Sequence, residues 1–327
     1  MLKLRRGEVV SLEPLEVRLE GTEEARKTWA DPNTVGACQV GDEVIVNVEA
    51  LDLGLGSGGF DLVHVNLTRG LEAGGSATEH VMKLNYTSLQ HPVSTMERPA
   101  ETPRRAAVPV LAIGLHGHLA PAAWAAAEAG ATAIGYVQTG GGALPGSLSR
   151  DVSDLLDRGL LAGHVTAGPA YGGGEEAITL IGAIDGAAEL GWKAVIAGPG
   201  PGILGSATAY GHGGMAALDV IHAALALDAP ALLSPRLSSG DPRPRHQGLS
   251  HHTRSVLELA LGPVTVPMPV EFMELAPDVA GVVPVDVDLA AYGESGLPRR
   301  TMGRDLEEDR PFFAGPLAAG KALAGLV

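Results

Sequence analysis

The sequence is short of cysteine, of aromatic residues and of long apolar runs, and each shortage excludes a class of protein. One cysteine, Cys38, in 327 residues excludes an internal disulfide framework and any cysteine-rich zinc module. Aromatic residues make up 4% of the chain, too few for the stacking platforms that bind single-stranded nucleic acid. No apolar run reaches the roughly 18 residues needed to span a bilayer. Because the opening MLKLRRGEVV also lacks an apolar signal core, we expect a cytoplasmic protein with no membrane partner.

Positive charge is also scarce. The chain has 23 Lys+Arg against 38 Asp+Glu, a net charge of −15, which argues against a non-specific nucleic-acid binder, so we expect no nucleic-acid partner. Hydrophobic residues make up 45% of the chain. A chain of this length and composition can bury large cores and is expected to divide into two domains.

The first hundred residues predict a small β-rich domain. GEVVSLEPLEVRLEG, VGDEVIVNVEAL and FDLVHVNLTRGL alternate apolar and polar residues between Gly and Asp turns, as the short strands of a small barrel do. The stretch RPAETPRRAAVP then combines proline with charge before a different periodicity begins. We therefore predict a barrel-like domain over residues 1–103 and a second domain over residues 104–327.

The second domain reads as an α/β fold. VPVLAIGL, ATAIGYV, AGHVT, KAVIA and PALLS are short, continuous apolar runs, typical of parallel strands that are covered on both faces. Helical stripes separate them: one follows Ser149 as a possible N-cap, and another is expected to open at Glu175 and Glu176 and to end before Gly191. This alternation predicts a doubly wound, mostly parallel α/β domain.

Unusual loops follow all five predicted strands, and the last of them is strongly basic. In open α/β sheets, ligands bind at the C-terminal edge of the strands, where glycine allows close approach and helix N-termini offer free N–H groups. SPRLSSGDPRPRHQGLSHHT, residues 234–253, gathers arginine and histidine around a single acid, Asp241. We predict that this segment and the GPGPGILGS loop converge on one anion; the alternative is a solvated, internally paired loop. The predicted anion-binding residues are Arg236, Arg243, Arg245, Ser250, Gly200, Gly202, Gly205, Ser206 and His116, with Ser250 as the cap of a helix that begins at His251.

Four residues are candidates for proton transfer. His246, His251 and His252 lie in the basic segment, and Glu175 follows three glycines, where its alternative role is to complement a helix dipole. Arg304 is expected to pair with Glu307 or Glu308 rather than to join the site. No nucleophile elbow and no Walker loop occurs, so the reaction type stays open.

No cofactor is identified by the sequence. In an extended chain the HxH pair His116 and His118 would point to the same side, and His212, Asp241, His246, His251 or His252 could add a further ligand. We nevertheless predict no tightly bound transition metal, because neighbouring arginines repel a cation. Gly200 to Gly205 spells GxGxxG after the strand KAVIA, and Arg236 could meet the 2′-phosphate of NADP. The long run from there to the next helix and its prolines make this a weak alternative.

Several long stretches resemble a bacterial family known as a domain of unknown function, the DUF-3866 family. They are LGLGSGGFDLVHVNL, HVMKLNYTSLQHPV, GPGPGILGSATAYGHGG, SPRLSSGDPRPRHQGLSHHT and TMGRDLEEDRPFF. The resemblance implies no activity, so two hypotheses rest on the residues alone. The first is an enzyme acting on a small phosphorylated or carboxylated metabolite, and the second is a non-catalytic ligand-binding or regulatory protein that senses such an anion. An NADP-binding oxidoreductase is the weaker third.

Overall fold

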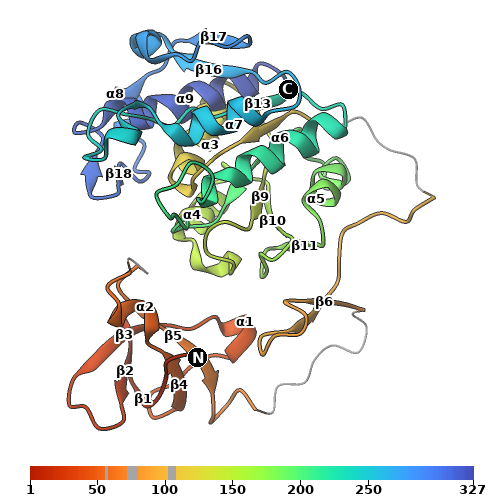
Figure 1. Ribbon diagram of the computed structural model, residues 1–327. Helices are drawn as coiled ribbons and strands as arrows, with labels where there is room; N and C mark the ends of the chain where they lie inside the picture. Colours follow the sequence, from red (N-terminus) through yellow and green to blue (C-terminus); the bar gives the residue numbers. More distant parts are fainter. Residues whose placement is uncertain (56–57, 72–79, 102–107) are drawn as a thin grey trace. The chain divides into compact units, whose positions relative to one another are not determined.

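The computed structural model describes residues 1–55, 58–71, 80–101 and 108–327 (Figure 1). The chain divides into two compact units, Met1–Ser94 and Thr95–Val327. The domain boundary that we predicted near Pro103 lies outside the described residues. None of the described helices combines the length and the apolarity needed to cross a bilayer.

The N-terminal unit contains a closed five-stranded barrel, which confirms the predicted barrel-like fold. Its order is β1-β2-β3-β5-β4, with β4 back beside β1 and a parallel β3–β5 pair, so it is a Greek-key barrel of the kind found in OB-folds. Alternate residues such as Val9, Val17 and Val44 fill it. The elements of this unit are β1 (Leu4–Leu12), β2 (Leu15–Leu19), β3 (Ala25–Trp29), α1 (Pro32–Val35), β4 (Glu43–Asn47), α2 (Glu49–Asp52), β5 (Asp61–Asn66), and the hairpin of β6 (Val81–Lys83) and β7 (His91–Val93).

A six-stranded parallel sheet forms the centre of the second unit. Its order is β11-β10-β9-β12-β8-β13, and every neighbouring pair is parallel. The five predicted strands are all present, and their continuous apolar sequence follows from burial on both faces. The strands are β8 (Val110–Ala112), β9 (Ile134–Thr139), β10 (Gly163–Ala167), β11 (Glu175–Ala177), β12 (Ala194–Pro199) and β13 (Ala231–Leu233).

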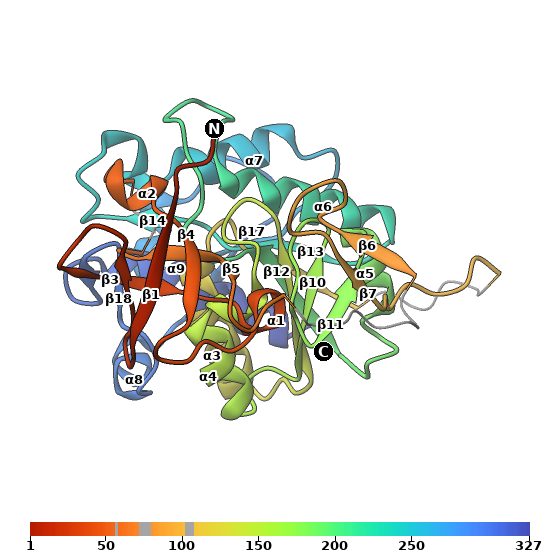
Figure 2. The same cartoon turned by 90° about the horizontal axis from the view of Figure 1, so that it is seen from below.

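Helices cover both faces of this sheet, as a doubly wound fold requires (Figure 2). Leu111 and Ile196 belong to the core under α3, α4 and α9, whereas Val110 and Val195 belong to the core under α5, α6 and α7. The helices are α3 (Leu119–Glu128), α4 (Arg150–Asp157), α5 (Leu180–Gly186), α6 (Ala216–Ala226), α7 (His251–Leu259), α8 (Leu289–Glu294) and α9 (Arg310–Ala324).

The prediction that Glu175 and Glu176 open a helix is wrong. They lie in β11, a three-residue edge strand that pairs directly with β10, and α5 begins only at Leu180 after the N-cap Thr179. The Glu176 carboxylate accepts hydrogen bonds from the Gly172 N–H at 2.5 Å and from the Thr166 hydroxyl at 2.7 Å. These contacts hold the glycine run in a tight turn. The chain therefore continues from this turn into strand β11 and not into a helix.

The remaining strands are short and lie in the C-terminal part of the second unit. The apolar segment VTVPMPV contains β16, which pairs in parallel with β17 and is joined to β13 through a bridge between Leu232 and Thr265. The bounds are β14 (Leu237–Ser238), β15 (Gly248–Leu249), β16 (Val266–Pro269), β17 (Val282–Val285), β18 (Arg300–Thr301) and β19 (Arg304–Asp305).

Candidate functional site

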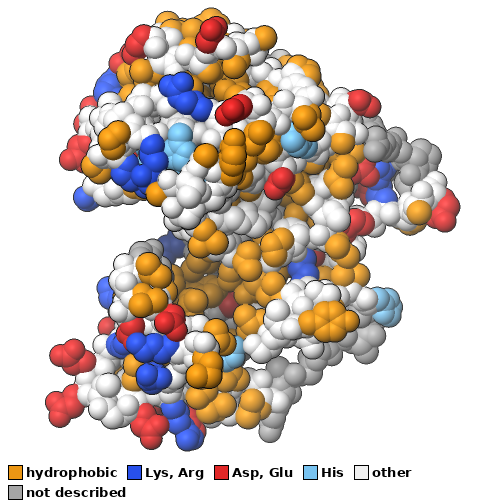
Figure 3. Space-filling model, in the orientation of Figure 1, with side chains coloured by type: hydrophobic (Ala, Val, Ile, Leu, Met, Phe, Trp, Pro, Cys, Tyr) orange, Lys and Arg blue, Asp and Glu red, His pale blue; other side chains and the backbone are white. Residues whose placement is uncertain are grey.

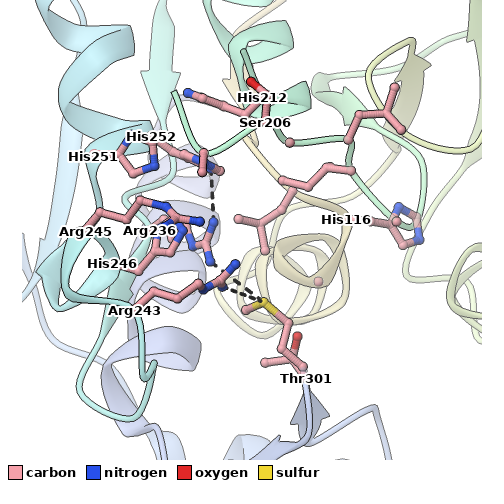
Figure 4. A pocket seen from close by; sticks show the side chains of 18 of the residues that line it. His116, Ser206, His212, Arg236, Arg243, Arg245, His246, His251, His252 and Thr301 are labelled. Carbon is pink, nitrogen blue, oxygen red and sulfur yellow. Dashed lines mark hydrogen bonds between the residues drawn. The ribbon is translucent and has the colours of Figure 1, made fainter. Parts of the chain in front are cut away.

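A cavity of about 650 Å³ lies where the winding of the sheet changes direction. β8 and β12 are neighbours, but the helix after β8 packs on one face of the sheet and the helix after β12 packs on the other. Their loops therefore part and leave a crevice, the usual ligand position in open α/β folds. Residues 115–117 after β8, residues 202–208 after β12 and the basic segment after β13 line it (Figure 4).

One buried carboxylate, Asp241, is shared by three arginines. Arg243 donates to it twice, from Nε to Oδ1 at 2.8 Å and from Nη2 to Oδ2 at 2.6 Å. Arg236 Nη2 and Arg304 Nη2 lie 3.4 Å and 3.6 Å from Oδ2. Burial opposes ionisation of Asp241, but the hydrogen bonds and charge of Arg243 outweigh it and hold its pKa below the usual range. The carboxylate stays charged and anchors the basic wall.

A second buried carboxylate, Asp309, holds Arg304 and the loop after β13. Arg304 Nε donates to Asp309 Oδ2 at 2.9 Å, and the Ser238 hydroxyl and Ser239 N–H donate to the same carboxylate at 2.7 Å and 2.8 Å. The expected pairing of Arg304 with Glu307 or Glu308 is therefore wrong. Sequence reasoning missed Asp309 because the residues it joins lie some 70 positions away.

Positive charge is in surplus at this wall. Among the described residues, Arg236, Arg243 and Arg304 share only the two carboxylates named above, and Arg245 adds a fourth guanidinium group. Arg245 lines the cavity and has neither an ion pair nor a hydrogen-bond partner within the part of the chain that the structure describes. Burial, together with the charge of Arg243, lowers the pKa of Arg236 to about 10, so it still carries its charge at pH 7. Figure 3 shows Lys or Arg side chains beside a histidine on this face, near β18.

Four histidines, His212, His246, His251 and His252, surround the arginines. The rings of His212 and His252 stack with centroids 3.6 Å apart, and His251 lies edge-on to both. His246 packs against His251 and His252 at centroid distances of 5.0 Å and 4.9 Å. His212 comes from the loop after β12, so the two predicted loops do converge, as Figure 4 shows.

These histidines are neutral at pH 7. Burial and the charge of Arg236 lower the pKa of His246 to about 3 and that of His252 to about 2. Burial also lowers the pKa values of His212 and His251. Arg236 Nη1 donates to His252 Nδ1 at 3.0 Å, and because a guanidinium only donates, the His252 proton sits on Nε2.

Ser250 caps α7 as predicted. Its hydroxyl oxygen accepts from the His252 N–H at 3.2 Å and lies 2.7 Å from His246 Nδ1. The hydroxyl is buried and does not line the cavity, so its role is to fix the first turn of α7 and the His246 ring.

The HxH pair does not form a metal site. The expected extended conformation is wrong, because His116–His118 is a 3₁₀ turn and its two histidines have separate partners. His116 Nε2 lies 2.6 Å from Ser149 Oγ, and His118 Nδ1 lies 2.8 Å from Ser234 Oγ. Only His116 lines the cavity, on the side opposite the basic wall.

Glycine contacts hold the loop after β12. The carbonyl oxygen of Gly141 accepts from the Leu204 N–H at 3.1 Å, and a Cβ added at Gly213 would lie 1.8 Å from that same oxygen. A Cβ added at Gly200 would lie 2.4 Å from the Ala143 carbonyl oxygen. Backbone therefore packs on backbone here, and only glycine fits. Gly200 positions the loop from behind rather than lining the cavity.

The structure brings most of the predicted site residues together. Those that line the cavity are Arg236, Arg243, Arg245, Gly202, Gly205, Ser206, His116, His246, His251, His252 and His212. Those that do not are Ser250, Gly200, His118 and Glu175. Glu175 lies on β11, at the edge of the sheet opposite β13, and is exposed.

The geometry does not suit a dinucleotide. α6 begins at Ala216, well past Gly205, so the third glycine of GxGxxG does not open a helix. Arg236 follows β13, which is separated from β12 by β8, whereas the ribose-reading residue belongs on the strand beside the glycine loop. Both observations argue against NADP.

This arrangement defines an α/β protein with a basic, histidine-lined cavity at its topological switch point. The chain belongs to the family described as "Protein of unknown function (DUF3866)", whose family model matches residues 27–320. No curated protein and no solved structure matches the chain.

Proposed function

We propose that the protein is an enzyme that binds a small phosphorylated or carboxylated metabolite in the switch-point cavity. The observation that carries the proposal is the surplus of guanidinium charge on one wall, with Arg245 free to contact a ligand. An acidic chain of net charge −15 has ample carboxylates to neutralise its arginines elsewhere. Several arginines held side by side by two buried carboxylates form an arrangement that recognises an oxyanion.

The anchors give the wall a fixed shape. Arg243 is bound by two hydrogen bonds to Asp241, and Arg304 is bound to Asp309, so little side-chain entropy is lost when a ligand arrives. Pre-organised donors are also what stabilise charge that develops during a reaction. A wall of this kind serves catalysis as well as binding.

His246 is the histidine that we propose for proton exchange. Its Nδ1 is held by Ser250, which leaves Nε2 as its available nitrogen, and the residue lines the cavity. His251 and His252 are the other candidates. This role separates the enzyme from the alternative, a non-catalytic protein that senses the same anion. We further propose that the protein acts in the cytoplasm and needs no nucleic acid or membrane, as its charge and its single cysteine suggest.

Thermal unfolding in matched salts tests the binding step. Millimolar phosphate or sulfate is expected to raise Tm more than chloride does at equal ionic strength, because only a bidentate oxyanion engages the wall. Arg245→Ala is expected to remove most of the excess. Lys193→Ala is the matched control: it loses the same charge from an exposed residue just before β12, at the opposite end of the strands. Equal shifts in all salts, or equal losses in both variants, would contradict the proposal.

Turnover tests the enzyme against the sensor. Native mass spectrometry of the purified protein identifies retained anions, which are then incubated with enzyme and followed for product. His246→Asn is expected to abolish product formation while keeping the phosphate-dependent rise in Tm. Tight binding of the retained anion with no product would favour the sensor.

A further inference from the structure

Three histidines from two loops bring ring nitrogens close together, and since His212 and His252 stack face to face, one of these two rings must turn before both can bind one ion. His212 comes from the loop after β12, and His251 and His252 form the first turn of α7. One ring nitrogen of each lies within 4.8 Å of the others. Sequence reasoning considered each of the three only as an addition to His116 and His118, because nothing in the sequence shows that a residue 39 positions before His251 lies beside it.

Two of the three histidines have a buried ring nitrogen that makes no hydrogen bond with any described residue. His212 Nε2 donates to the Ala209 carbonyl oxygen at 3.1 Å, so its proton sits there and Nδ1 carries the free lone pair. His212 Nδ1 and His251 Nε2 are both buried and have no hydrogen-bond partner among the described residues. A buried polar atom without a partner costs free energy, which a ligand at this point would offset. The carbonyl on the far side of His212 is the usual arrangement behind a metal-bound imidazole.

We propose that His212, His251 and His252 bind one divalent transition-metal ion such as Zn²⁺, with an open coordination position towards the cavity. Three imidazoles with a fourth position left open make up a common catalytic zinc site, and imidazole is a preferred ligand of this class of ion. Such an ion would supply Lewis-acid chemistry to an anion bound at the basic wall. The proposal does not depend on the proposed function, because metal binding is measured without any substrate.

Arg236 competes with a metal ion for His252. It donates to His252 Nδ1 at 3.0 Å, so the lone pair of that nitrogen is occupied. A metal on His252 Nε2 instead would require a proton on Nδ1, which would then face a group that only donates. Either mode breaks the Arg236–His252 hydrogen bond. Arg236 keeps its ion pair with Asp241 and becomes available to an anion.

This departs from the expectation of no tightly bound metal. That expectation rested on repulsion by the arginines, and the structure leaves two of them as its main sources: Arg236, and Arg245, which has no carboxylate partner among the described residues and acts on His251. Arg243 is held by Asp241 and Arg304 by Asp309, whereas Arg236 touches a ligand ring directly. We therefore expect Arg236 to weaken metal binding rather than to prevent it.

Metal titration of the full chain tests the site. Protein dialysed against a chelator is titrated with Zn²⁺, and separately with Co²⁺, whose visible absorption reports four-coordinate nitrogen ligation. We expect one ion per chain by elemental analysis, at least a 100-fold weaker affinity in His212→Ala, and the same loss in half-buried His251→Ala. His222→Ala on α6 is the matched control and keeps the wild-type affinity.

Arg236→Gln gives the opposite expectation, since it frees His252 Nδ1 and removes the nearest charge: affinity should rise about tenfold. Near-ultraviolet circular dichroism verifies that each variant is folded, and His212→Gln replaces His212→Ala if the latter is not. Absence of saturable binding in both wild type and Arg236→Gln, or unchanged binding in the His212 and His251 variants, would overturn the site. Unchanged or weaker binding in Arg236→Gln would overturn the competition.

The anion experiment is run on chelator-treated protein, so the two proposals fail separately. Loss of the phosphate effect with zinc binding intact would remove the proposed function and leave the metal site. Loss of zinc binding with the phosphate effect intact would do the reverse.

Discussion

Each unit holds a cluster of charged side chains that includes at least one buried carboxylate, and the clusters are balanced differently. In the barrel, Arg26 pairs with Asp61 at 2.6 Å and with Asp52 at 2.8 Å, and Lys3 also pairs with Asp52. Two cations therefore meet two carboxylates. In the α/β unit, by contrast, the cluster contains four guanidinium groups and only two carboxylates among the described residues.

The difference supports the proposal that the barrel cluster is structural and that the α/β cluster binds a ligand. A cluster that serves only the fold gains nothing from uncompensated charge, since burial penalises it. The barrel cluster is neutral and closes on itself. The α/β cluster has a surplus of positive charge beside a cavity, where a bound anion could neutralise that charge. Comparing the response of the two clusters to the same kind of change therefore tests the whole interpretation.

The largest expected effect follows from Asp241→Asn. It leaves three arginines facing a neutral amide and should destabilise the α/β unit by about 3–5 kcal/mol. Asp61→Asn should cost the barrel only about 1 kcal/mol, because Arg26 keeps Asp52 and because burial already raises the pKa of Asp61. Urea unfolding followed by peptide-level hydrogen exchange measures each unit separately.

Adding phosphate gives a second comparison between these two variants. It should recover stability in Asp241→Asn, where an oxyanion replaces the missing carboxylate, and should have no such effect in Asp61→Asn. Equal costs for the two variants, or equal responses to phosphate, would show that the clusters do not differ in kind.

A smaller effect is expected from acid, through one buried histidine of the α/β unit. Burial, with the charge of His116, lowers the pKa of His164 to about 4 in the folded state, against about 6.5 when unfolded. Between these values the unfolded chain binds the proton first, so stability is complete above pH 6.5 and falls as the pH drops towards 4. The loss should be about 3 kcal/mol at pH 4.

His164→Gln should flatten this part of the pH profile. Stability is measured as the urea midpoint at half-unit pH steps, with the same peptides as reporters. A profile of the variant parallel to that of the wild type would show that His164 does not set the acid limit.

The smallest effect concerns helix caps. Ser250→Ala and Thr179→Ala each remove an N-cap hydrogen bond, and each should cost about 1 kcal/mol. Only the Ser250 variant should also reduce the phosphate-dependent rise in Tm, because Ser250 orients His246 and the first turn of α7. A reduced phosphate effect in Thr179→Ala as well would mean that general softening, not the cap at the cavity, is responsible.

The strands and the edge of the sheet at which the cavity lies could be predicted from the sequence because both depend on local pattern. Strands buried on both faces need continuous apolar runs, and parallel strands bring their C-terminal loops to one edge. Ser250 was predictable as a cap for the same local reason.

Three features depend on distant parts of the chain and escaped prediction. Glu175 and Glu176 looked like a helix start because the contacts that hold them, strand pairing with β10 and the Glu176 hydrogen bonds, are tertiary. Arg304 and Asp309 join a wall formed by residues some 60 to 70 positions earlier. His212 meets His251 and His252 although β8 lies between β12 and β13, and strand order is not written in any local stretch.

The glycine contacts behind the cavity have a consequence for how this family varies. Gly213 follows His212 directly, and backbone atoms of Gly141 leave no room for a side chain there. The position of a histidine that we propose as a metal ligand thus depends on two residues whose side chains carry no functional group. Selection for activity should act on Gly141 and Gly213 as strongly as on the histidines, so a scan of all single substitutions should find intolerance at positions that no substrate touches.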